Sequence, residues 1–127
     1  MRYLGIDYGA KRVGLAISDD SESFAFPLKV LENSKDLIYD ISYICKENKI
    51  GEIVLGESKD FSQKENEIMK EIKPFAKSLE DELNIPVYLH PEFMTSLEAE
   101  QIQGKNKMRD ASAAAIILKS YLDTKHT

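Results

Sequence analysis

Arg2-Tyr-Leu-Gly-Ile-Asp-Tyr-Gly-Ala-Lys-Arg-Val-Gly-Leu-Ala-Ile-Ser18 has the pattern of a β-hairpin, and the rest of the chain can be arranged around it. In its first half the side chains alternate between two faces, with Leu4 and Ile6 on one face and Asp7 on the other. A short connection over residues 9–12 leads into a second alternating strand. We therefore expect Asp7 near the end of a central strand. A carboxylate placed there costs free energy unless a partner such as a metal ion neutralises it.

Outward from this hairpin, the pattern of apolar residues alternates between helices and strands. After the hairpin we expect an edge strand over 24–31, a helix over 33–48 capped by Asn33 or Ser34, and a buried strand over 52–56. A polar loop over 57–63 then leads into a long helix ending at Leu83 and a strand over 86–89. The chain ends with a short helix opening at Thr95, a basic connection over 104–109 and a last helix over 110–123. Pro27 fits a strand only at an edge or a bulge, and Pro74 should kink or divide its helix. This order predicts one α/β domain over residues 1–127: a mixed five-stranded sheet, three antiparallel strands then two parallel, flanked by helices.

Length and composition are those of an ordinary globular protein. The chain has 127 residues, of which 43% are hydrophobic and 31% charged, and no apolar run approaches the roughly 20 residues that span a bilayer. The N-terminus shows no signal-peptide pattern, and Cys45 is the one cysteine, so we expect a cytoplasmic protein without an intrachain disulfide or a membrane partner. A net charge of −5 argues against broad, non-specific nucleic-acid binding, although it leaves room for a local basic patch.

Four carboxylates fall at the ends of predicted elements: Asp7, Glu57, Glu92 and Asp110. If the strands before the first three are parallel neighbours, their carboxyl ends converge on one edge of the sheet. Clustered carboxylates repel unless a cation neutralises them, and hard oxygen ligands select Mg²⁺ or Mn²⁺. Two such ions can activate a water and stabilise the leaving oxygen in phosphodiester cleavage. Carboxylates at element ends are also common without a metal, and Asp110 could simply favour a helix dipole, so the residues alone leave both interpretations open.

Four segments carry a resemblance to a known family: GIDYGAKRVGLAISD (5–19), EIVLGES (52–58), PEFMTSLEA (91–99) and RDASAAAIILKSYLD (109–123). In order and spacing they resemble the small bacterial family of YqgF-type Holliday-junction resolvases, also described as pre-16S rRNA nucleases. That family is similar in fold to ribonuclease H and to the RuvC resolvase, and it is cytoplasmic. The resemblance implies an RNase H-like sheet and a metal-dependent nuclease, a hydrolase of ester bonds, that acts in maturation of the 5′ end of 16S ribosomal RNA.

The resemblance also assigns the acidic residues. Asp7 matches the family's first metal-binding Asp, Glu92 the Glu of its usual Asp-Glu-Arg triplet, and Asp110 the Asp that opens its last helix. Glu57 stays open as a fourth ligand, because RuvC carries an acid at the end of the equivalent strand whereas the family usually has an apolar residue there. The triplet departs from the family pattern, since Phe93 replaces its Arg and removes a bidentate phosphate or carboxylate clamp.

Five basic residues lie in the segments that border the acidic ones: Lys11, Arg12, Lys105, Lys107 and Arg109. As a group they could hold substrate phosphates without reading a base sequence, although each lysine alone could equally be a solvated loop residue. His90 could donate a proton to the leaving oxygen, or be a half-exposed residue at a strand end. Tyr8 could pack beside Asp7 or stack on a base.

Three kinds of function fit these residues. The first is a nuclease on pre-rRNA, with cleavage of branched DNA by a homodimer as a close variant, so a monomer and a homodimer both remain open. The second is a nucleotide-binding module of the actin and sugar-kinase type, which the absence of a Walker-type loop disfavours. The third is a non-catalytic nucleic-acid or ribosome-assembly factor, which the Phe93 departure keeps open.

Overall fold

A computed structural model describes residues 1–58, 69–92 and 109–125, with residues 57, 58, 69, 92 and 109 described by their backbone alone. The elements in chain order are β1 (Arg2–Tyr8), β2 (Arg12–Ser18), β3 (Ala25–Glu32), α1 (Leu37–Asn48), β4 (Ile50–Ser58), α2 (Met69–Leu83), β5 (Val87–Glu92) and α4 (Arg109–Lys125). The predicted short helix at Thr95 and most of the predicted basic connection lie outside the described residues. Within the described ranges, no helix is long and apolar enough to cross a membrane.

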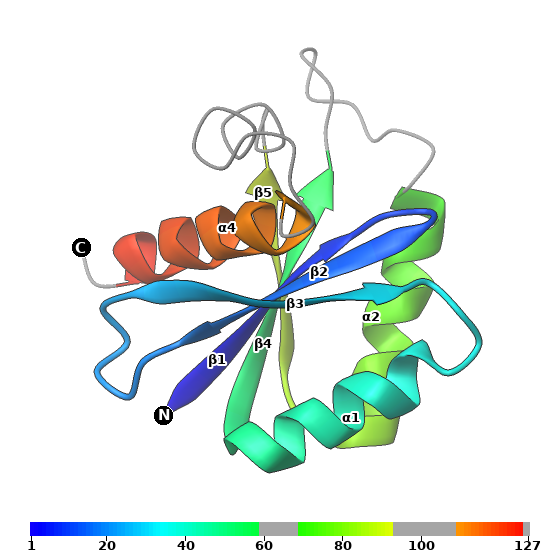
Figure 1. The fold of residues 1–127 in the computed structure, drawn as a ribbon, viewed down its shortest axis with the longest axis horizontal. Helices are drawn as coiled ribbons and strands as arrows, with labels where there is room; N and C mark the ends of the chain where they lie inside the picture. The colour runs from blue at the N-terminus through cyan, green and yellow to red at the C-terminus, as the bar shows by residue number, and fades with distance from the viewer. Residues whose placement is uncertain (59–68, 93–108, 126–127) are drawn as a thin grey trace.

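The five strands form one mixed sheet in the order β3-β2-β1-β4-β5, with β1 at its centre (Figure 1). β1 pairs antiparallel with β2, and β2 pairs antiparallel with β3. β1 and β4 are parallel, as are β4 and β5. The predicted sheet of three antiparallel and two parallel strands is therefore confirmed. Because β1, β4 and β5 run in the same direction, their carboxyl ends share one edge of the sheet.

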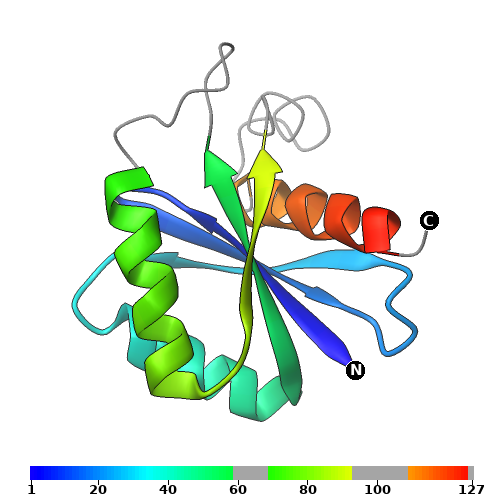
Figure 2. The ribbon, with the colours of Figure 1, turned by 180° about the vertical axis from the view of Figure 1, so that it is seen from behind.

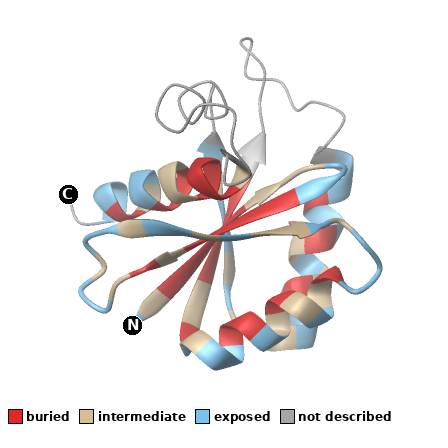
Figure 3. Ribbon diagram, viewed as in Figure 1, coloured by how far each residue is buried: buried red, intermediate tan, exposed pale blue. Residues whose placement is uncertain are grey.

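Helices cover both faces of this sheet: α4 lies on one face, and α1 and α2 lie on the other (Figures 1 and 2). The alternation predicted for the hairpin is confirmed, since Leu4 and Ile6 join the core under α1 and α2 whereas Tyr3 joins the core under α4. Buried residues run along the middle of the central strands (Figure 3). Position 7 is in step with Tyr3, so Asp7 belongs to the α4 face.

Glycines let α4 approach the sheet closely. A Cβ at Gly5 would lie 2.8 Å from the Cβ of Leu118, and a Cβ at Gly14 would overlap the carbonyl of Asp110. Side chains at these two positions would push the helix away from β1 and β2. The first turn of α4, with Asp110, is therefore seated directly on the hairpin.

The edge position of β3 confirms the prediction from Pro27. The ladder between β2 and β3 shifts register between Leu15 and Ala16, and Pro27 pairs with Ala16 at this irregularity. Cys45 is buried among apolar residues of α1, as expected, and its burial raises the pKa of its thiol to about 11.

Two local predictions were wrong, and a third is narrowed. α1 begins after Asp36 and neither Asn33 nor Ser34 caps it, because the Asn33 side chain instead donates to the Gly9 carbonyl at 2.8 Å. Residues 57 and 58 continue β4 rather than opening a loop, since parallel pairing with β5 extends to Ser58. Pro74 was predicted to kink or divide its helix; α2 is one continuous helix through Pro74, so only the kink remains a prediction.

The close contact at Gly14 gives a direct test of this packing. We expect Gly14→Ala to lower the free energy of unfolding by about 1–3 kcal/mol, because the new methyl group meets backbone that cannot move independently. Gly51→Ala is the matched control, since its Cβ would clash with the flexible Met1 side chain and make only ordinary contact with backbone. Urea unfolding of both variants measures the difference, and an equal loss at both positions would contradict the packing argument.

Candidate active site

Asp7 and Asp110 flank the same glycine. In the β1–β2 ladder Asp7 stands opposite Gly14, and the backbone of Asp110 packs against Gly14 from the α4 side. Asp7 is half-buried, and the Asp110 side chain is 29% exposed. The structure thus brings together two of the predicted ligands, one from each end of the chain, at the carboxyl edge of the parallel strands.

The backbones of Glu57 and Glu92 lie at the same edge. Leu55 of β4 pairs with both Ile6 and Leu89, and further along the ladder Glu57 pairs with Pro91 and Ser58 with Glu92. Position 92 is in step with Tyr88, which stacks on Tyr121 of α4, whereas position 57 is in step with Leu55 of the opposite core. The side chains of Glu57 and Glu92 lie outside the described residues.

Arg12 contacts a predicted metal ligand. Its Nε donates to Oδ2 of Asp110 at 2.9 Å, while the Arg12 side chain remains 64% exposed. The hydrogen bond to the Asp110 carboxylate, followed by its charge, raises the pKa of Arg12. Lys11 is exposed on the same turn. Arg109, described by its backbone alone, begins α4, and Lys105 and Lys107 lie outside the described residues.

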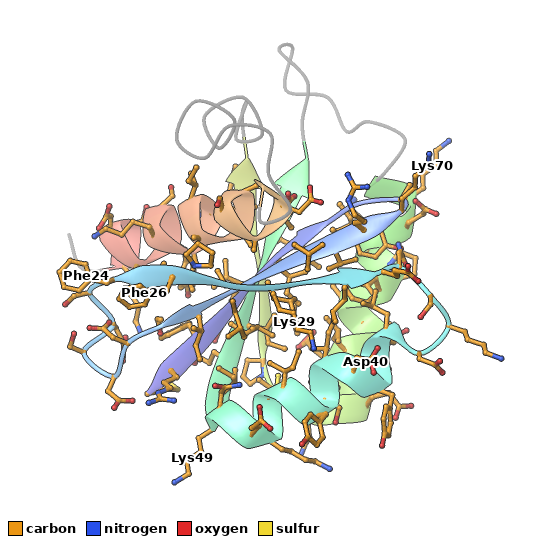
Figure 4. The ribbon with its side chains drawn as sticks, in the orientation of Figure 1. Phe24, Phe26, Lys29, Asp40, Lys49 and Lys70 are labelled. Atoms are coloured by element: carbon orange, nitrogen blue, oxygen red, sulfur yellow. The ribbon has the colours of Figure 1, made fainter. Side chains whose placement is uncertain are left out.

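Two residues at this end of the molecule were missed from the sequence. Asn33 fixes the β1–β2 turn: its side chain donates to the Gly9 carbonyl at 2.8 Å, and its backbone N–H donates to the Lys11 carbonyl at 2.9 Å. Lys70 stands at the first turn of α2, at the same end of the molecule as this turn (Figure 4). The sequence did not indicate the turn contact of Asn33, because Asn33 has the side chain of a helix cap. It did not indicate the position of Lys70, because the pattern around Lys70 is that of a helix interior.

The donor set suits a hard divalent cation. Asp7 and Asp110 offer carboxylate oxygens, the ligands that Mg²⁺ and Mn²⁺ prefer. Gly14, which pairs with Asp7, places no side chain of its own beside this carboxylate. Within the described parts of the chain, no group of three or more His, Cys, Asp and Glu side chains is assembled.

His90 and Tyr8 are engaged in packing. Nε2 of His90 lies 2.9 Å from the Ser120 hydroxyl, and its ring stands edge-on to Tyr121. Ser120 is almost three helical turns along α4 from Asp110, so this contact holds His90 on the helix rather than at the acidic pair. Tyr8 packs on Phe75 of α2 with ring centroids 4.7 Å apart.

Comparison with known proteins identifies the family. The model of the RuvX family, described as Holliday junction resolvase, matches residues 1–124. This chain belongs to that family. A protein of Maridesulfovibrio salexigens named "Putative pre-16S rRNA nuclease" is 36% identical over 132 residues, covering 96% of this chain and 98% of the relative. A protein of Dictyoglomus turgidum with the same name is 37% identical over 134 residues, covering 98% of this chain and 95% of the relative.

Solved structures agree with this fold. RuvC of T. thermophilus, in complex with a Holliday junction substrate, matches with a TM-score of 0.64 at 16% identity, covering 99% of this chain and 96% of RuvC. The fowlpox virus resolvase, in complex with Holliday junction DNA, matches with a TM-score of 0.62 at 14% identity, and both chains are covered completely. The predicted family and RNase H-like fold are confirmed, and with them the assignment to a family of nucleases.

The burial of His90 predicts a pH dependence of stability. Desolvation lowers the pKa of His90 below its ordinary 6.5. As the pH falls below about 6.5, His90 becomes protonated in the unfolded chain before it does in the folded chain. The free energy of unfolding therefore falls as the pH drops. We expect His90→Gln to remove this part of the dependence. Urea unfolding at about pH 7.5 and pH 5.5 measures it, and equal pH slopes for the variant and the unmodified protein would refute it.

Proposed function

We propose that this chain is a metal-dependent nuclease that hydrolyses phosphodiester bonds during maturation of the 5′ end of pre-16S rRNA in the cytoplasm. The observation that carries the proposal is the placement of Asp7 and Asp110 on either side of Gly14, at the carboxyl edge of the parallel strands. Membership of the RuvX family, with relatives named for pre-16S rRNA, supports the reaction class and the substrate.

The site residues divide into metal ligands and phosphate contacts. We assign Asp7, Asp110 and Glu92 as ligands of Mg²⁺ or Mn²⁺. Glu57 is kept as an alternative fourth ligand because its backbone lies at the same edge, although position 57 is in step with Leu55 of the opposite face. The bound ions would activate a water and stabilise the leaving oxygen. The protein's own contribution is to fix the carboxylates on rigid elements: Asp7 within the central strand, and Asp110 in a helical turn held against Gly14.

Basic side chains around this edge would hold the phosphates on either side of the scissile bond. Lys11 and Arg12 come from the hairpin turn, and Lys105, Lys107 and Arg109 come from the segment before Asp110. These contacts carry no base specificity, so binding should weaken as salt rises. Cleavage of branched DNA is the second candidate function, favoured by the family description and by the junction complexes among similar folds. Junction cleavage would require a homodimer, whereas a monomer suffices for cleavage of rRNA. In either case we assign residues 1–127 to one nuclease domain.

Removing one ligand charge tests the assignment. We expect Asp7→Asn and Asp110→Asn each to reduce metal-dependent cleavage by about 100-fold or more. A tenfold decrease in rate needs only ~1.4 kcal/mol of lost transition-state stabilisation, and a catalytic metal ion supplies several kcal/mol. Asp20→Asn is the matched control, since this carboxylate pairs with Arg2 at 2.9 Å and is 80% exposed on the surface. Purified proteins are given Mg²⁺ or Mn²⁺ with precursor 16S RNA and, in parallel, a four-way DNA junction.

The two substrates separate the two candidate functions. Cleavage of the RNA that both Asp variants lose supports the proposal, and cleavage of the junction alone would replace it with the DNA function. Cleavage that persists unchanged in Asp7→Asn would indicate a contaminating nuclease and remove the site assignment. Nucleic-acid binding without cleavage by the unmodified protein would favour the non-catalytic assembly factor.

A further inference from the structure

An ion pair joins the hairpin to the first turn of α4. Nε of Arg12 donates to Oδ2 of Asp110 at 2.9 Å, across 98 residues of sequence. Arg12 opens β2 and stands two residues before Gly14, against which the Asp110 backbone packs. The same close approach that positions Asp110 as a metal ligand therefore also places it within reach of a guanidinium.

We propose that Arg12 is an exchangeable counter-ion of Asp110, which releases the carboxylate when a divalent cation binds and then contacts a substrate phosphate. This inference rests on the proposed metal site. A guanidinium and a divalent cation compete for the same carboxylate oxygens, so a metal bound by Asp110 must displace or weaken the ion pair. Guanidinium groups bind phosphate with the same two-pronged geometry with which they bind carboxylates.

The exposure of the two partners shows which of them can move. The Arg12 side chain is 64% exposed and sits at the end of a long aliphatic stem, whereas the Asp110 side chain is 29% exposed on a helix held by backbone contact. Displacement therefore moves Arg12 and leaves Asp110 in place. An exposed pair of this kind is weak, which is what an exchangeable contact requires.

This exchange couples metal binding to nucleic-acid binding. In the free protein Arg12 opposes the metal, because binding the metal costs the ion pair. With nucleic acid bound, the released Arg12 contacts a phosphate, so Arg12 then favours the metal. By thermodynamic reciprocity the metal strengthens nucleic-acid binding by the same factor. A purely structural Arg12, or one that only binds phosphate, would not produce opposite effects in the two states.

The experiment measures Mn²⁺ affinity by calorimetry, first in the protein alone and then with a saturating phosphorothioate-linked RNA strand that resists hydrolysis. We expect Arg12→Gln to bind Mn²⁺ about two- to fivefold more tightly than the unmodified protein when no RNA is present. With RNA bound the order should reverse, and Arg12→Gln should bind Mn²⁺ more weakly than the unmodified protein. Unfolding curves check that the variant remains folded, which the exposure of Arg12 favours.

Lys11→Gln is the matched control, since it removes the same charge from the neighbouring position and keeps the Arg12–Asp110 pair. Equal tightening in both variants would reduce the effect to long-range charge and overturn the proposal. Unchanged or weaker Mn²⁺ binding by RNA-free Arg12→Gln would also overturn it. If the unmodified protein binds Mn²⁺ and Asp7→Asn does not, the metal site stands whatever Arg12 does; absence of Mn²⁺ binding in the unmodified protein would overturn both proposals.

Discussion

The close contact between α4 and the hairpin is the constraint on which the site depends. Gly5 and Gly14 carry no side chain where the helix crosses β1 and β2, and the backbone of Asp110 occupies the space that a side chain at position 14 would fill. Two carboxylates from opposite ends of the chain can then face one glycine. A larger separation between helix and sheet would move Asp110 away from Asp7. The glycines therefore determine both the packing of α4 and how near these two carboxylates lie.

The elements that could be predicted from the sequence are those whose pattern of apolar residues lies within a single strand or helix. Alternation in the hairpin, the continuous apolar run of β4 and the alanine-rich stripe of α4 each determine their own element, and these elements form where they were expected. The acidic residues could be expected at one edge because parallel strands end together. The start of α1 and the role of Asn33 could not, because Asn33 is a good helix cap by its own chemistry and is instead held by Gly9. Nor does any local pattern connect Arg12 with Asp110, since their contact exists only after α4 has packed on β2.

Gathering carboxylates at one edge has an electrostatic cost in a protein whose net charge is already −5. Each half-buried carboxylate raises the energy of its neighbour unless a positive charge lies close by. Arg12 supplies such a charge for Asp110, within hydrogen-bonding distance and from a rigid strand. Under the proposed exchange, this neutralisation comes at the cost of some affinity for the metal that the acidic groups would bind.

The departure at Phe93 and the ion pair at Arg12 bear on the same problem. The family resemblance places an arginine directly after the acidic residue at the end of β5, where this chain has phenylalanine, so the sequence offers one guanidinium fewer for phosphate contact. Arg12 lies on β2, across β1 from β4 and β5, and contacts Asp110 directly. In the proposed exchange, the Arg12 guanidinium would leave Asp110 and contact a phosphate from this side of the site. Under the proposed function, the absence of an arginine at position 93 gives the hairpin turn, with Lys11 and Arg12, a larger share of the basic groups that would contact phosphate.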